Sequence, residues 1–402
     1  MSTQKQCQIH EANCPDFPPG ANISTASVKS FIAVILSGFV GLLIVSRNVI
    51  DASFGILSSD LPDHFRLLTT LKDSGWFFYS TWYYLEQLFV LGSKNETTFF
   101  ASALVLLASL YMAKSMIFTR IQQEFGATPI ESFILGLALS FAIALPSLNT
   151  INQLGTISPN VFHSSTQVLA ITTGVLAIVA TSVFVSSGGQ LAGFALIGFS
   201  ILSATAKPAL TLPILTTHSL ILFYFLRQDK FQFCRRIRIL SVVIFSELAI
   251  MLLGYYFSYT SSSWNPNLVV IDPFLGWDKI SGNILIDLLR SLVFPIAGLI
   301  LLFPILKCKS ISTFVIPAWI TLFVALVQLT LFAEVSKVDG SVFGAGNFVW
   351  GPMIANAGLF TITVIACRHL ELTRKLMAYS FLALHSLTGL VFLYVWHMSP
   401  RI

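Results

Sequence analysis

Residues 31–47 read FIAVILSGFVGLLIVSR, an apolar run that carries no charged side chain before its last position. A helix of this length and composition crosses the hydrocarbon core of a bilayer. Ten further apolar runs follow, separated by short polar connections. We therefore expect about eleven membrane-spanning helices, near 31–47, 98–114, 131–147, 167–186, 191–205, 209–226, 239–257, 284–304, 311–332, 351–367 and 377–396.

The composition of the whole chain agrees with this pattern. Of 402 residues, 55% are hydrophobic and 10% are charged, and 35 are Phe, which excludes a soluble domain. The sequence predicts an all-α, polytopic integral membrane protein. One region stays open, because Lys207-Pro208 interrupts the apolar stretch 191–226. That stretch fits either two spans joined by a tight turn or one span plus a re-entrant piece.

The distribution of Lys and Arg predicts the orientation. With the N-terminus inside and alternating loops, fourteen basic residues fall on the inner side and eight on the outer side. This asymmetry obeys the positive-inside rule, so we expect an N-in, C-out protein of the cytoplasmic (inner) membrane. The net charge of +5 then reflects membrane orientation, and no nucleic-acid partner is expected. All five cysteines fall on the inner side, so no disulfide is expected.

This topology divides the chain into two parts. Residues 1–28 are polar and are expected to form a flexible cytoplasmic tail. Residues 29–402 form a single transmembrane domain, whose long outer loops are 48–97, 148–166, 258–283 and 333–350. Polar residues concentrate in these outer loops, which indicates that the protein works on the extracytoplasmic face.

The first outer loop carries the densest cluster of ionisable side chains. Residues 59–66 read SDLPDHFR and place Asp60, Asp63, His64 and Arg66 shortly after the first span. Pro62 suits the first turn of a juxtamembrane helix, on which Asp60 and His64 lie one turn apart. An almost wholly aromatic stretch, 76–84, follows at headgroup level. Two interpretations fit: an interfacial belt with a helix cap, or a surface helix that carries an active site.

Other candidate residues lie in later outer loops and within the spans. Asn160 and His163 precede the fourth span, where Asn160 can also cap a helix. Glu334, Asn347 and Trp350 combine a carboxylate, an amide and an indole, which suits sugar binding or an interfacial turn. Lys207 can reach the surface or hold a diphosphate. Within spans, Asp287 and Arg290 are spaced to pair, Arg290 can instead meet a phosphate, and Glu247 is a lone carboxyl near mid-span.

Four segments together suggest a family. They are Asp60-Leu61-Pro62-Asp63-His64, Ser158-Pro159-Asn160-Val161-Phe162-His163, Ala206-Lys207-Pro208-Ala209-Leu210 and Gly346-Asn347-Phe348-Val349-Trp350-Gly351. Their order resembles the GT-C superfamily of polytopic glycosyltransferases, and more closely a poorly characterised bacterial GT-C-like family. The resemblance spans roughly 55–355. It departs from the family pattern at Ser164-Ser165-Thr166, where relatives carry Asn-Pro-Thr.

The resemblance implies transfer of a sugar from a polyprenyl-phosphate-linked donor to a glycan or lipid acceptor of the cell surface, in polysaccharide biosynthesis at the cell envelope. In that reaction Asp60 is the general base and Asp63 its less favoured substitute. His64 and His163 orient the reactants. The remaining candidates bind substrate: Arg66, Asn160, Lys207, Arg290, Glu334, Asn347 and Trp350. No cofactor is required, although the outer carboxylates leave a bridging divalent metal open.

Three alternatives stay open beside the glycosyltransferase, and one of them is a non-catalytic assembly subunit. A transporter or flippase of a lipid-linked glycan would place its working polar groups near the midplane of the membrane. A membrane O-acyltransferase of surface polysaccharide would use an outer His as its base. Membrane lipids are expected partners in every case.

Overall fold

The computed structural model describes residues 27–53, 81–90, 95–146, 156–162, 165–227, 234–256, 267–337, 340–341 and 346–398. Asp60, Asp63, His64, Arg66 and His163 lie outside these ranges, as does nearly all of the expected tail 1–28.

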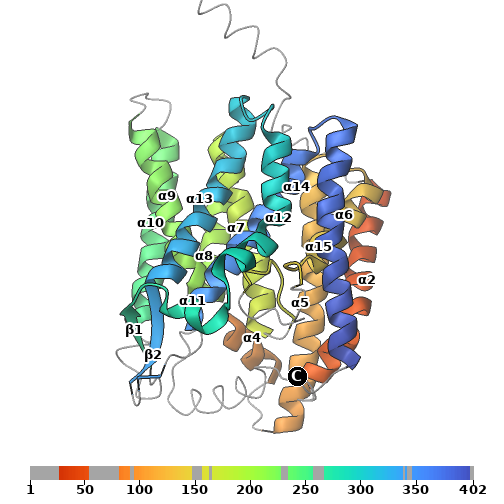
Figure 1. The fold of residues 1–402 in the computed structure, drawn as a ribbon, viewed down its shortest axis with the longest axis vertical. Coiled ribbons are helices and arrows are strands. Elements are labelled where there is room, and N and C mark those ends of the chain that lie inside the picture. The colour runs from red at the N-terminus through yellow and green to blue at the C-terminus, as the bar shows by residue number, and fades with distance from the viewer. Residues whose placement is uncertain are drawn as a thin grey trace, which may run out of the picture.

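Within the described ranges the chain is a bundle of long helices (Figure 1). Its long helices are α2 (Val28–Ser53), α5 (Glu96–Glu124), α6 (Pro129–Phe141), α7 (Ser165–Ser187), α8 (Gln190–Ala206), α9 (Thr211–Leu226), α10 (Cys234–Tyr255), α12 (Ile284–Leu302), α13 (Lys309–Leu331), α14 (Trp350–Cys367) and α15 (Leu372–Met398). Short elements are α4 (Thr81–Val90), η1 (Pro208–Leu210), β1 (Asn267–Ile271), α11 (Leu275–Ile280), β2 (Phe332–Ser336) and η4 (Gly346–Val349).

Nine described helices are long and apolar enough to cross a membrane, and α6 and α8 are shorter apolar helices. These eleven helices lie where the eleven apolar runs are. The chain is therefore a multi-pass helical membrane protein, while its exact number of crossings and its orientation stay predictions. The interrupted region 191–226 forms two helices, α8 and α9, joined by Lys207 and the 3-10 turn η1.

The two ends of the bundle differ. The lower end in Figure 1 holds α4, α11, β1, β2 and the C-terminus, and the upper end holds the end of α9, the start of α10 and the connection from α14 to α15. Contacts at the upper end join several helices there. Gln123 at the end of α5 donates to the Ser30 carbonyl in the first turn of α2, and Arg368 after α14 pairs with Glu131 in the first turn of α6. The lower end corresponds to the predicted outer side.

Helices α7 and α14 lie at the centre of the bundle. In their apolar windows 89% and 94% of residues are buried inside the protein. The two helices approach closely, since a Cβ on Gly358 would lie 2.4 Å from Ile178 Cδ1. Inside a membrane the hydrophobic effect gives helices little drive to associate. Small residues at such contacts instead let the helices approach closely, so that van der Waals packing stabilises their association.

The lower end contains a two-stranded sheet that the all-α prediction misses. Strands β1 and β2 are antiparallel, with Val269 opposite Glu334. Asn267–Ile271 is rich in β-branched residues, which favour strands, and both segments lie in predicted loops beyond the apolar spans. The expectation of no disulfide is also wrong, because Cys308 is disulfide-bonded. Predicted sidedness assigns each cysteine to a compartment, but it does not predict which cysteines lie close enough to form a bond.

Helix α6 stops short of the depth expected of a span. Its 13 residues extend about 20 Å, against a hydrocarbon thickness of about 30 Å. The chain then continues without helix from Ala142, in place of the predicted helix to 147. A Cβ on Gly389 of α15 would lie 1.8 Å from the Phe141 carbonyl oxygen, so α15 crosses directly over the end of α6.

Candidate functional site

Two of the four segments quoted above, 206–210 and 346–351, meet at the lower end of the bundle together with the start of α7. The side chain of Lys207 donates a hydrogen bond to Thr166 Oγ1 over 3.2 Å, and its Nζ lies 4.2 Å from the centroid of the Trp350 ring. Thr166 is in the first turn of α7 and Trp350 begins α14. We call these three residues the lower-end cluster. It joins positions 41 and 143 residues from Lys207 along the chain.

Local backbone geometry explains why Lys207 points into this cluster. Lys207 ends α8 in an extended conformation, because Pro208 disfavours a helical residue before it. The turn η1 then packs on the start of α14, where a Cβ on Gly351 would lie 2.7 Å from the Ala209 carbonyl oxygen. Lys207 and Trp350 are both partly buried, so their cation–π contact is partly desolvated.

Asn160 lies elsewhere, deep in the bundle. Its Nδ2 donates to the carbonyls of Leu139 and Ala142, and its Oδ1 accepts from Lys114 Nζ over 2.8 Å. Asn160 thus caps the end of α6, the helix before it, whereas the sequence suggested a cap for the helix after it. The cap supplies donors that the last carbonyls of α6 would otherwise lack.

Lys114 is a residue that sequence reasoning misplaced. The predicted span ended at 114, which put this lysine at the inner surface, but α5 continues to Glu124. Lys114 is buried with 1% exposure, and the rings of Tyr111 and Phe162 lie 5.4 and 5.7 Å from its Nζ. Among the described residues no carboxylate pairs with it. A buried ammonium of this kind marks a candidate functional position by default.

The predicted pair of Asp287 and Arg290 is confirmed. Arg290 Nη1 lies 2.6 Å from Asp287 Oδ1, and Arg290 Nε donates to the Leu145 carbonyl over 2.7 Å. Asp287 also accepts from Ser281 Oγ. Arg290 therefore fixes the nonhelical segment after α6, and its buried Nη2 has no hydrogen-bond partner.

The remaining predicted residues are less informative. Glu334 is buried on β2, and β2 contacts η4 through the stacked rings of Phe332 and Phe348. Asn347 belongs to η4, next to the lower-end cluster along the chain. Asn160 and Arg290 form their hydrogen bonds with the chain at and after the end of α6. Of the described candidates, the structure brings Lys207 and Trp350 into contact.

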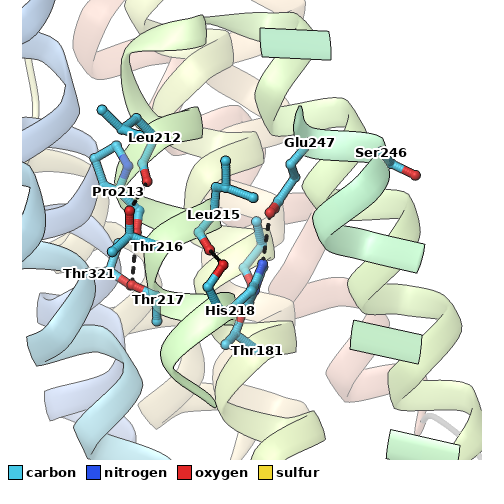
Figure 2. Close-up of polar contacts among 12 residues, drawn as sticks. Thr181, Leu212, Pro213, Leu215, Thr216, Thr217, His218, Ser246, Glu247 and Thr321 are labelled. Atoms are coloured by element: carbon cyan, nitrogen blue, oxygen red, sulfur yellow. Dashed lines mark hydrogen bonds and ion pairs between the residues drawn. The ribbon is translucent and has the colours of Figure 1, made fainter. Parts of the chain in front are cut away.

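A second polar group lies inside the bundle, between α7, α9 and α10 (Figure 2). His218 Nδ1 lies 3.0 Å from Glu247 Oε2, and His218 Nε2 lies 2.9 Å from Thr181 Oγ1. His218 and Glu247 are fully buried. The second carboxyl oxygen of Glu247, Oε1, is buried without a hydrogen-bond partner. The carboxyl that the sequence left as a lone group therefore has a histidine partner.

The protonation pattern of this pair follows from the hydrogen bonds. Thr181 donates its hydroxyl proton to the Ala177 carbonyl, so its oxygen accepts from His218 Nε2. His218 therefore carries a proton on Nε2. The contact with Glu247 then needs one proton, held either on Nδ1 or on the carboxyl, and the pair has no net charge in either case. His218 carried no sequence signal, because a single histidine in an apolar span matches no motif.

The described residues contain no group of three or more His, Cys, Asp or Glu side chains arranged to hold a metal.

Comparison with known proteins gives no family: no family model and no curated protein matches the chain.

Proposed function

We propose that the chain is a membrane glycosyltransferase that moves a sugar from a polyprenyl-phosphate-linked donor to a glycan or lipid acceptor. The reaction takes place at the lower end of the bundle, on the extracytoplasmic face of a bacterial cytoplasmic membrane. The observation that carries the proposal is the lower-end cluster. Lys207 and Trp350, from two of the segments quoted for their resemblance to GT-C enzymes, come into contact there with Thr166 of α7.

The cluster supplies groups that such a transfer needs. The leaving group is a lipid phosphate, and Lys207 at the end of the bundle is a cation within reach of the headgroup region. Trp350 offers an indole face, against which the apolar face of a sugar ring packs. Asp60 remains the proposed base that takes the proton of the acceptor hydroxyl, with His64 and His163 orienting the reactants.

Transfer of radiolabelled sugar from polyprenyl-phosphate donors, measured in reconstituted vesicles, tests this proposal. We expect Asp60→Asn to lower the rate at least 100-fold, the lower bound for a general base. Lys207→Gln should raise the KM for the donor about tenfold, the effect of one charge-assisted hydrogen bond. Lys307→Gln removes a cation at the opposite end of the bundle and should leave both constants unchanged.

The outcomes separate the parts of the proposal. Full activity of Asp60→Asn would remove Asp60 as the base. An unchanged KM for Lys207→Gln would remove the lower-end cluster as the donor site. A wild-type protein that uses no lipid-linked donor would refute the enzyme altogether.

The buried pair of His218 and Glu247 favours one second candidate, a proton-coupled transporter of a lipid-linked glycan. Transporters carry titratable groups inside the membrane, and this pair holds a single shared proton there. Uptake of a lipid-linked glycan that depends on a pH gradient and is abolished in Glu247→Gln would support the transporter. Sugar transfer that is unaffected by the same variant would support the enzyme.

A further inference from the structure

The upper end of the bundle contains a cavity of about 470 Å³ between α7, α9, α10 and α13. Three cationic side chains line it, Arg235, Arg236 and Lys309. Hydroxyl groups of Ser310 and Thr313 line it as well. None of the described residues that line the cavity is acidic. The described charges around this volume are therefore all positive.

The two arginines are held in place by the end of α7. Arg235 Nη2 donates to the Gly188 carbonyl over 2.7 Å, and Arg236 Nη1 donates to the Val185 carbonyl over 3.2 Å. Gly188 has a φ of +65°, and a Cβ there would lie 2.2 Å from Arg236 Nε. These bonds satisfy carbonyls at the end of α7, which is one reason for arginines at this place. The bond from Arg235 uses one of the five N–H donors of its guanidinium.

Helix capping does not explain the third cation. Lys309 begins α13, on the other side of the cavity from the end of α7, and its ammonium has no hydrogen bond or ion pair in the described structure. Cys308, which precedes it, provides no side-chain cap. The first turn of α13 therefore adds free backbone N–H groups and the positive end of a helix dipole to the same volume. Arg235, Lys309 and the N-terminus of α13 therefore place positive charge around one volume, which favours a bound anion.

We propose that this cavity is a binding site for a phosphate ester. Guanidinium groups match the geometry of phosphate oxygens, and Lys309 with the hydroxyl of Ser310 adds donors from the opposite wall. The volume lies in the range of cavities that hold organic ligands, so the ligand is larger than free phosphate. Tyr224 and Phe225, which also line the cavity, provide an apolar wall for the organic part. This site is separate from the lower-end cluster, at the other end of the bundle.

A phosphate ester can reach this end of the bundle from a lipid headgroup or from solution. Native mass spectrometry of the full-length protein in detergent distinguishes these sources with two probes, phosphatidylglycerol and uridine diphosphate. Phosphatidylcholine, whose headgroup has no net charge, is the control lipid. We expect the wild type to retain one of the two anionic probes and to retain phosphatidylcholine at least tenfold less.

Substitutions in the cavity test its role. Arg235→Gln and Lys309→Gln should each weaken binding about tenfold, and together about 100-fold, because each removes a charge-assisted hydrogen bond. Lys307→Gln, two residues from Lys309 and outside the cavity, is the matched control and should bind as the wild type does. Arg235→Lys with Lys309→Arg keeps the charge and should stay within about threefold. It also shows that a loss in the Gln variants is not a failure to fold.

Binding of phosphatidylglycerol that is lost in the double Gln variant assigns the site to a lipid headgroup, and the same result with uridine diphosphate assigns it to a soluble ester. Equal binding of both probes by the double Gln variant and the wild type would overturn the proposal. So would a wild type that retains neither probe.

Discussion

The hydrogen-bond pattern of the buried pair of His218 and Glu247 predicts how strongly different substitutions of Glu247 lower the stability of the protein. Because His218 Nε2 donates to Thr181, its Nδ1 needs either a proton of its own or a donor on residue 247. Glu247→Gln supplies such a donor, since the amide N–H can point to Nδ1 at the same distance. Glu247→Ala supplies none and leaves Nδ1 buried without a partner.

The two variants should differ clearly in stability. Removing one member of a buried pair costs about 3–5 kcal/mol, because the other member stays buried and unpaired. Hydrogen bonds between membrane helices contribute about 0.6 kcal/mol on average and up to about 1.7 kcal/mol. We therefore expect Glu247→Ala to lower the free energy of unfolding by about 3 kcal/mol or more, and Glu247→Gln by less than about 1.7 kcal/mol.

Reversible unfolding in bicelles, followed by tryptophan fluorescence, measures both values. Ser246→Ala is the matched control on the same helix, because Ser246 points away from the pair and its hydroxyl bonds only to the Val242 carbonyl (Figure 2). It should cost less than about 0.5 kcal/mol. Equal losses for Glu247→Ala and Glu247→Gln would refute the assigned hydrogen-bond pattern.

Three further predictions concern packing, capping and pH. Asn160→Ala removes two bonds to α6 carbonyls and should cost about 2–3 kcal/mol in the same unfolding assay; a loss below 1 kcal/mol would contradict the cap. Gly389→Ala places a Cβ against the Phe141 carbonyl and should prevent stable folding. The control Gly198→Ala, with no atom within 4 Å of its Cβ, should be neutral or stabilising. Equal melting temperatures of the two variants would refute the close approach of α15 to the end of α6. Burial and the adjacent positive charge lower the pKa of His369 from 6.5, so the folded state prefers the neutral ring. Stability should fall as pH drops below about 6.5, and His369→Gln should reduce that loss; an unchanged pH profile would contradict it.

Apolar length predicted the number and position of the long helices well, because burial of backbone in lipid permits little else. It predicted their ends poorly. Lys114 ended a predicted span because a charge usually marks the surface, yet α5 continues ten residues beyond it. Only the partner, Asn160 from a distant segment, makes that burial tolerable, and pairing between distant segments has no signature in a single sequence.

The candidate site likewise contains contacts that the sequence predicts and contacts that it does not predict. The pair of Asp287 and Arg290 was predictable because i, i+3 spacing on a helix fixes their distance. Lys207 and Trp350 were separate candidates in the sequence, which did not predict their contact, and His218 was missed altogether. The strands β1 and β2 were missed because both segments were assigned to loops that connect apolar spans.

The nonhelical chain after α6 explains why several of these polar residues exist. Backbone at this depth requires protein partners, because lipid offers none. Pro295 of α12 has no N–H to give to the Ser291 carbonyl, and that carbonyl accepts from Asn356 Nδ2 instead. Asn356 also donates to the Ile157 carbonyl, which ties the chain after α6 to α12 and α14.

His385 completes this set of partners from α15. Phe294 donates its N–H to His385 Nε2, so the imidazole proton is on Nδ1, which donates to the Ile143 carbonyl over 2.6 Å. The ring is therefore neutral and acts as a bridge between α12 and the chain after α6. A histidine with both nitrogens committed to backbone cannot serve as a catalytic base without breaking the segment it holds. Lys207, Lys114 and Glu247 differ from His385 in this respect, because the hydrogen bonds described here for their side chains go to other side chains.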